Sequence, residues 1–233
     1  FSMHHDELLQ VLDFLRAAES LKTVTRSGWT SAGERESVAE HTWRLCLMTL
    51  VLRPGFPEVD FAKLVRTCIV HDLGEAIGGD VPAPEQARRG TSKASDERRD
   101  LLTLVAALPT PQREEVVALW DEYEEGATPE ARLAKGLDKL ETILQHTQGA
   151  NPPDFDYRFN LGYGRRYTED HPLLVELRTI LDTETERRAR EIEHDGRTSR
   201  PCFRRGCRRR GCLTSASTRP RLPDESPTPV EPA

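Results

Sequence analysis

Long apolar runs are absent from this sequence of 233 residues. No stretch approaches the roughly 20 consecutive apolar residues of a membrane-spanning helix, and the first residues lack the basic and apolar segments of a signal peptide. Cysteine is scarce as well, at five residues. Cys46 and Cys68 lie in apolar helical stretches, which is typical of reduced core thiols. We therefore expect a cytoplasmic protein that has no membrane partner.

An excess of positive charge is also missing, because 33 Lys and Arg residues face 39 Asp and Glu residues, for a formal net charge of −6. Seven arginines and no acidic residue lie between residues 197 and 210, so the rest of the chain is more acidic than the total suggests. An acidic body disfavours broad electrostatic attraction to nucleic acid or membranes. A small-molecule ligand is therefore expected, with no specific nucleic-acid partner.

Alternating strand patterns are nearly absent, and helix signals dominate. A capping box at residues 37–40 predicts a helix that begins beside His41, and Thr-Pro pairs predict two further helix starts. The expected helices cover about residues 8–22, 38–52, 61–77, 95–108, 110–123, 129–147 and 172–192. The sequence thus predicts an all-α bundle of about seven helices without a sheet over residues 3–194. Residues 195–233 are rich in Pro, Arg, Ser and Thr and are expected to form a disordered tail.

His71, Asp72 and Glu75 form the densest polar group in the predicted third helix. His71 and Glu75 are four residues apart and share a helix face, and Asp72 lies at the edge of that face. Apolar neighbours predict that this helix is mostly buried. A His-Asp pair in a helix is more often a core histidine with its hydrogen-bond partner than a ligand pair. The pair alone therefore does not identify a site.

His41 and Asp138 extend this group, each from a different predicted helix. Asp138 lies on an amphipathic helix, where an ordinary solvent-facing role would also fit. Taken together with His71 and Asp72, the ordered set offers two imidazoles and two carboxylates. Such donors with open positions suit one divalent ion, Mn²⁺, Co²⁺ or Mg²⁺, better than a closed structural zinc site.

The order and spacing of several stretches resemble the HD-domain metal-dependent phosphohydrolases, in the subgroup of the 5′-deoxynucleotidases. The resemblance covers about residues 8–190. The matching stretches are Leu21–Trp29, Glu36–His41, His71–Glu75, Gly79–Pro82 and Leu137–Glu141. A lone His-Asp pair would be a weak signal, whereas these stretches together are specific.

The resemblance implies a ligand set for one divalent metal ion: His41, His71, Asp72 and Asp138. It also implies that Glu75 and Asp80 assist catalysis, that Arg26 orients the phosphate and that Trp29 lies near the sugar. Two residues separate Arg26 from Trp29, whereas the corresponding Arg and Trp are adjacent in the bacterial members. Members of this branch are often dimers, so a homodimer is expected.

Elementary chemistry agrees with the core of this assignment. A phosphate monoester dianion resists attack, so its hydrolysis needs positive charge on the phosphoryl oxygens and a positioned water. Glu75 could orient or deprotonate that water, while Arg26 could form a two-pronged contact with phosphate. The absence of histidine between Asp72 and Asp138 favours one metal ion over two.

The expected activity is removal of the 5′-phosphate from a deoxynucleoside monophosphate or a related small nucleotide. One alternative is another HD-domain nucleotide hydrolase, of the nucleoside triphosphate or guanosine tetraphosphate type. A second alternative is a regulatory module that binds a nucleotide without hydrolysing it.

Overall fold

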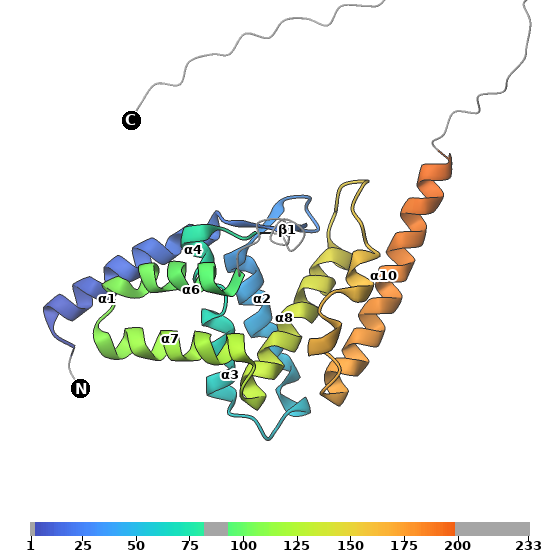
Figure 1. Ribbon diagram of the computed structural model, residues 1–233. Helices are drawn as coiled ribbons and strands as arrows, with labels where there is room; N and C mark the ends of the chain where they lie inside the picture. The colour runs from blue at the N-terminus through green and yellow to red at the C-terminus, as the bar shows by residue number, and fades with distance from the viewer. Residues whose placement is uncertain (1–2, 82–92, 199–233) are drawn as a thin grey trace, which may run out of the picture.

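The computed structural model describes residues 3–81 and 93–198, and their regular secondary structure is helical apart from one hairpin (Figure 1). The helices are α1 (His5–Ala18), α2 (Val38–Leu52), α3 (Phe61–Val70), α4 (Glu75–Gly78), α6 (Lys93–Leu104), α7 (Thr110–Glu125), α8 (Pro129–Gln148), α9 (Phe159–Gly162) and α10 (Pro172–Thr198). Short 3₁₀ segments are η1 (Glu19–Lys22), η2 (Arg53–Gly55), η3 (Val105–Ala107) and η4 (Arg165–Tyr167). The predicted all-helical fold class is confirmed.

One hairpin departs from the expectation of a chain without a sheet. Strands β1 (Thr25–Trp29) and β2 (Arg35–Ser37) pair antiparallel, with an irregular register between the two ends of β1. Neither strand carries the apolar alternation that would have revealed it in the sequence. The hairpin packs beside α8 and leads directly into α2, so it brings residues of β1 to the middle of the bundle.

Helix α2 begins where its capping box predicts. The Ser37 side chain accepts a hydrogen bond from the Glu40 amide at 3.2 Å, and the Glu40 carboxylate accepts one from the Ser37 amide at 2.7 Å. These contacts satisfy amide groups that a helix start leaves without partners. The start of α2, and with it the position of His41 in the first turn, is therefore fixed.

The predicted third helix is interrupted at residues 71–74, so the expectation of one continuous helix to Ile77 was wrong. The amide of Glu75 bonds to the carbonyl of Asp72 at 3.1 Å, and not to that of His71. The His71 carbonyl instead accepts a hydrogen bond from the indole of Trp120 on α7, at 3.0 Å. A distant side chain thus takes the acceptor that a regular helix would use, and the backbone tightens into a turn.

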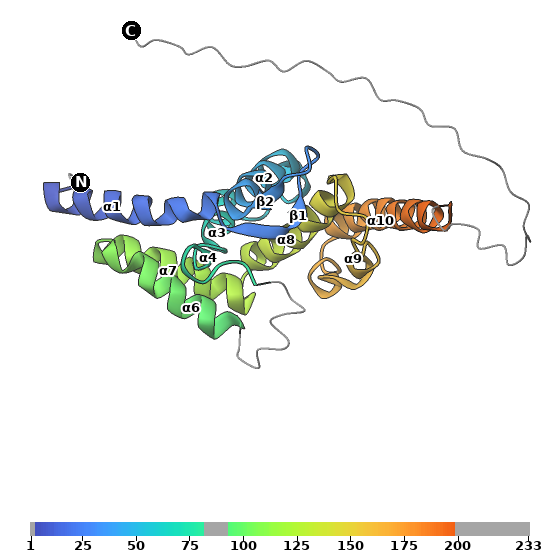
Figure 2. The same ribbon diagram turned by 90° about the horizontal axis from the view of Figure 1, so that it is seen from above.

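Helix α8 lies at the centre of the molecule, where it contacts α2, α3, α7 and α10. Figure 2 shows α1, α6 and α7 grouped at one end of the bundle and α10 at the other. The core around α8 contains the buried side chains of Leu45, Phe56, Leu64, Leu137, Ile143 and Leu174. Cys68 is fully buried in this core as predicted, whereas Cys46 is only partly buried.

Helix α10 continues to Thr198, past residue 194, where the sequence analysis ends the folded body. The predicted tail from residue 199 onward lies outside the described residues, so its disorder stays a prediction. Within the described ranges, no helix combines the length and the apolarity that crossing a membrane requires.

Replacing Trp120 with alanine is expected to lower the free energy of unfolding by about 3–5 kcal/mol, because the indole is 2% exposed and also holds the turn at His71. Urea denaturation followed by circular dichroism measures the change. Trp43→Ala is the matched control, since that indole is 66% exposed, and it should change stability by no more than about 0.5 kcal/mol. Equal effects of the two substitutions would contradict this account of the turn.

Candidate functional site

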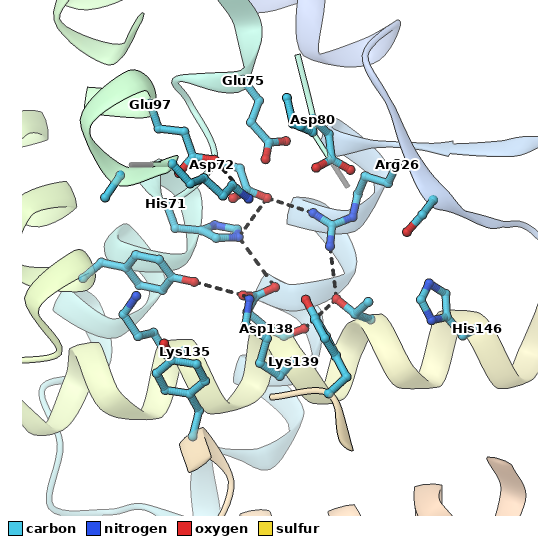
Figure 3. Close-up of a pocket in the computed structure, with 18 of the residues that line it drawn as sticks. Arg26, His71, Asp72, Glu75, Asp80, Glu97, Lys135, Asp138, Lys139 and His146 are labelled. Atoms are coloured by element: carbon cyan, nitrogen blue, oxygen red, sulfur yellow. Dashed lines mark hydrogen bonds and ion pairs between the residues drawn. The ribbon is translucent and has the colours of Figure 1, made fainter. Parts of the chain in front are cut away.

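A cavity of about 630 Å³ opens beside α8, and residues of β1, the α3–α4 turn, α6, α7 and the segment 155–167 also line it (Figure 3). Six residues singled out in the sequence line it: Arg26, His71, Asp72, Glu75, Asp80 and Asp138. His41 lies at the same place, buried behind the cavity floor. The fold therefore gathers the predicted set from segments that are far apart in the chain.

Three potential ligand atoms, from His41, His71 and Asp138, lie within 4.8 Å of one another in the buried part of the site. The Nε2 atom of His41 is 3.3 Å from Oδ1 of Asp138. Asp72 joins this group, because its Oδ2 atom is 3.1 Å from Nε2 of His71 and 3.8 Å from Nε2 of His41. Both Nε2 atoms are buried and make no hydrogen bond with the described residues. Two unpartnered imidazole nitrogens facing two carboxylates fit a divalent cation.

The opposite nitrogen of each imidazole is already engaged. His71 Nδ1 donates to the carbonyl of Cys68 at 2.8 Å, and His41 Nδ1 bonds to a carboxylate oxygen of Glu141. The other oxygen of Glu141 accepts a hydrogen bond from Arg44 Nε at 2.6 Å. When the rings are neutral, donation from Nδ1 leaves the Nε2 lone pair facing the carboxylates, which is the arrangement of a metal-binding histidine.

Glu141 belongs to the stretch Leu137–Glu141, but the sequence analysis gave it no role. Its spacing of three from Asp138 on a buried helix was the available signal. We predict that Glu141→Ala weakens Mn²⁺ binding about 10- to 100-fold, because His41 loses the group that orients it. Glu141→Gln should keep most of the affinity, since its amide oxygen can still accept from Nδ1. Calorimetric titration measures both, with the exposed Glu176→Ala as control. Unchanged affinity in Glu141→Ala would refute this role.

Asp138 is held ionised by its surroundings. Its Oδ2 atom accepts hydrogen bonds from the Lys139 ammonium at 2.7 Å and from the Tyr123 hydroxyl at 2.9 Å. Burial opposes ionisation, but the nearby positive charge, above all that of Lys139, holds the pKa of Asp138 well below its usual range. The carboxylate is thus available as a ligand at neutral pH.

The Arg26 side chain extends from β1 to this group of carboxylates and imidazoles. Its Nη1 atom donates to Asp72 Oδ2 at 3.0 Å, and its Nη2 atom donates to the Thr142 hydroxyl at 3.1 Å. Burial opposes ionisation of Asp72 as well, yet His71 and Arg26 lower the pKa of that carboxyl. A fixed guanidinium next to the carboxylate and imidazole cluster can attract an anionic group into the cavity.

Glu75 and Asp80 face the cavity from the side opposite α8 (Figure 3). Glu75 is 2% exposed, and its buried Oε2 atom has no hydrogen-bond partner among the described residues. Burial, together with the charges of Asp72 and Asp80, raises the pKa of Glu75 well above its ordinary value. Gly79 precedes Asp80 with a φ of 74°, a conformation that favours glycine and turns the chain back toward the cavity.

Trp29 does not line the cavity. Its ring makes an edge contact with Phe155, with 6.2 Å between the ring centroids, and Arg35 lies 4.6 Å above it. Phe155 does line the cavity. The structure therefore places Trp29 behind a lining aromatic side chain, and its predicted position near a sugar stays a prediction.

The sequence model of the HD domain family matches residues 18–178. The chain therefore belongs to the HD domain family. It is 33% identical over 196 residues to the 5′-deoxynucleotidase HDDC2 of Bos taurus, and the alignment covers 82% of this chain and 91% of that relative. The Homo sapiens 5′-deoxynucleotidase HDDC2 is 32% identical over 177 residues, which cover 75% of this chain and 85% of the human one.

A solved structure gives the same picture of the fold. The protein described as a predicted metal-dependent phosphohydrolase from Magnetospirillum magnetotacticum superposes with a TM-score of 0.68 at 26% identity. That match covers 79% of this chain and 98% of the Magnetospirillum chain. The bundle described above is therefore the fold of this family.

Proposed function

We propose that this chain is a metal-dependent phosphohydrolase that removes the 5′-phosphate from a deoxynucleoside monophosphate. One observation carries the proposal: two buried imidazole nitrogens, which have no hydrogen-bond partner among the described residues, converge with two carboxylates at the base of a cavity, and Arg26 binds one of those carboxylates. The 5′-deoxynucleotidases among the relatives support the substrate class. The cavity, at about 630 Å³, is of the size that small-molecule sites have.

In this proposal one divalent ion, Mn²⁺, Co²⁺ or Mg²⁺, is held by a set of four residues: His41, His71, Asp72 and Asp138. The mixed imidazole and carboxylate donors support this choice of metals. When bound, such an ion would act as a Lewis acid that neutralises charge on the phosphoryl group.

The chain's own groups then have separate tasks. Arg26 binds the phosphate through guanidinium N–H groups, and its bonds to Asp72 and Thr142 keep it in place. Glu75 orients the attacking water and accepts its proton, a task suited to a buried carboxylate whose pKa is raised. Asp80, on the same side of the cavity, is the second candidate for handling that water.

The test is phosphate release from a panel of nucleotides with and without added Mn²⁺ or Co²⁺. Deoxynucleoside 5′-monophosphates should be hydrolysed faster than the corresponding triphosphates. Preference for triphosphates or guanosine tetraphosphate would instead favour the other HD-domain hydrolases. Tight nucleotide binding without phosphate release under any metal would favour the regulatory module.

The family resemblance also leads us to propose a cytoplasmic homodimer that uses no specific nucleic-acid partner. Light scattering coupled to size-exclusion chromatography measures the oligomeric state directly. A monomer over the micromolar range would contradict that part of the proposal.

A further inference from the structure

One face of α8 carries a polar side chain at each successive turn along the cavity. Asp138, Thr142 and His146 are four residues apart, point in the same direction and all line the cavity. In Figure 3 the His146 ring stands on the same side of α8 as Asp138 and Lys139. The helix rise places His146 about 12 Å beyond Asp138, which is comparable with the length of an extended nucleoside monophosphate.

The His146 ring is held firmly, although the reaction described above does not use it. Its Nδ1 atom bonds to the side-chain oxygen of Asn160 at 2.9 Å. Phe155 packs edge-on against it at 4.9 Å between ring centroids. A Cβ atom at Gly28 would lie only 3.3 Å from Cδ2 of His146. The backbone of β1 therefore packs closely against the ring at a position that has no side chain. Such packing presents the ring in one orientation.

His146 offers a hydrogen-bond acceptor to the cavity. Burial, and secondarily the charge of Arg26, lower the pKa of His146, so the imidazole is neutral at pH 7. With Nδ1–H donated to the Asn160 oxygen, the lone pair is on Nε2. Among the described residues, the recorded hydrogen bond of this ring is the one at Nδ1. A ligand N–H group is the natural partner for Nε2.

The same cavity also has an aromatic surface. Phe159 precedes Asn160 on α9, lines the cavity and is 43% exposed, which leaves part of its ring free to stack. Two tyrosines that line the cavity already carry cations, and one of them, Tyr163, packs against Phe159 with 5.5 Å between the ring centroids. Lys135 lies 4.2 Å from the ring centroid of Tyr123, and Lys139 lies 5.4 Å from that of Tyr163. No cation lies over the Phe159 ring among the described residues, so this ring is the better place for a flat heterocycle.

We propose that Phe159 and His146 form the nucleobase subsite. Phe159 stacks on the base, and His146 Nε2 accepts a hydrogen bond from an exocyclic amino group, so the site favours bases that carry one. This inference rests on the proposed function, because it assumes that the phosphate lies at the metal ligands and Arg26. A single neutral hydrogen bond is expected to change kcat/KM about 3- to 10-fold.

The experiment compares three substrates: dAMP, the purine 2′-deoxyriboside 5′-monophosphate that lacks the amino group, and 2-deoxyribose 5-phosphate, which lacks the base. The wild type should have a kcat/KM about 3- to 10-fold higher for dAMP than for the des-amino nucleotide. In His146→Ala the two nucleotides should have equal kcat/KM values, while kcat/KM for 2-deoxyribose 5-phosphate should stay as in the wild type. Phe159→Leu should slow both nucleotides relative to 2-deoxyribose 5-phosphate. Each result is a ratio within one sample, so partial unfolding of a variant cancels.

Two further variants sharpen the result. His146→Gln retains an acceptor oxygen and should keep part of the preference, whereas His171→Ala, a histidine outside this cavity, should leave every ratio unchanged. The subsite is overturned if His146→Ala slows all three substrates by one factor, or if the wild type does not distinguish dAMP from the des-amino nucleotide. A wild type that hydrolyses none of the three overturns the proposed function, and the subsite with it.

Discussion

Replacing His71 with alanine is expected to abolish both metal binding and phosphate release. The imidazole Nε2 atom of His71 is buried, has no hydrogen-bond partner in the part of the chain that the structure describes, and is directed at Asp72 and Asp138. Alanine removes one of the four predicted donor atoms and leaves the ligand set incomplete, so the remaining groups should not retain an ion. Elemental analysis of the dialysed protein should fall from about one equivalent in the wild type to near zero.

The control for this variant is His5→Ala, because His5 is exposed on α1. That protein should bind metal and release phosphate as the wild type does. Chelation of the wild type should reproduce the loss, and Mn²⁺ or Co²⁺ should restore more activity than Zn²⁺. A His71→Ala protein that keeps a full equivalent of metal would show that the ion lies elsewhere.

Replacing Glu75 with glutamine is expected to separate chemistry from binding. The side chain is nearly isosteric, but the amide cannot accept a proton, so turnover should fall about 10²- to 10⁴-fold. Glu75 begins α4, beyond the turn that carries His71 and Asp72, and it lies among the lining residues. Metal content and the affinity for deoxynucleoside monophosphate should therefore stay near wild-type values.

Three measurements on each Glu75 variant decide the matter: metal content, ligand affinity and turnover. Turnover like that of the wild type would mean that another group activates the water, with Asp80 the next candidate. Loss of metal as complete as in His71→Ala would mean that Glu75 is a ligand. The outer-face substitution Glu176→Ala on α10 serves as the control for a charge change that does not touch the cavity.

Much of the bundle could be predicted because its signals are local. The capping box at Ser37 fixed the start of α2, and apolar periodicity located α8 and α10. The grouping of His41, His71 and Asp138 was inferred from their order, and the structure brings them together. The helix signals need only neighbouring residues in the chain, whereas the grouping rested on the order and spacing of stretches that resemble a known family.

The features that escaped prediction depend on distant partners. The interruption after α3 requires the Trp120 indole, which comes from α7. The role of Glu141 depends on burial against His41 and Arg44, two residues of α2. Helical spacing cannot tell which of several faces another element covers. The hairpin β1–β2 escaped because short polar strands carry no periodic signal.

The proposed ligands reach the cavity from α2, the α3–α4 turn and α8, three segments that are far apart in the sequence. The entropy of closing the intervening loops is lost on folding, so the folded chain presents its donor atoms with little further ordering. Helix α8 is docked by side chains such as Leu137 and Ile143, which do not line the cavity. Local opening of α8 would lower the fraction of molecules that can bind the metal ion. The apparent metal affinity falls in proportion to that fraction. The apparent metal affinity of this protein should therefore fall when the packing of the core around α8 is weakened.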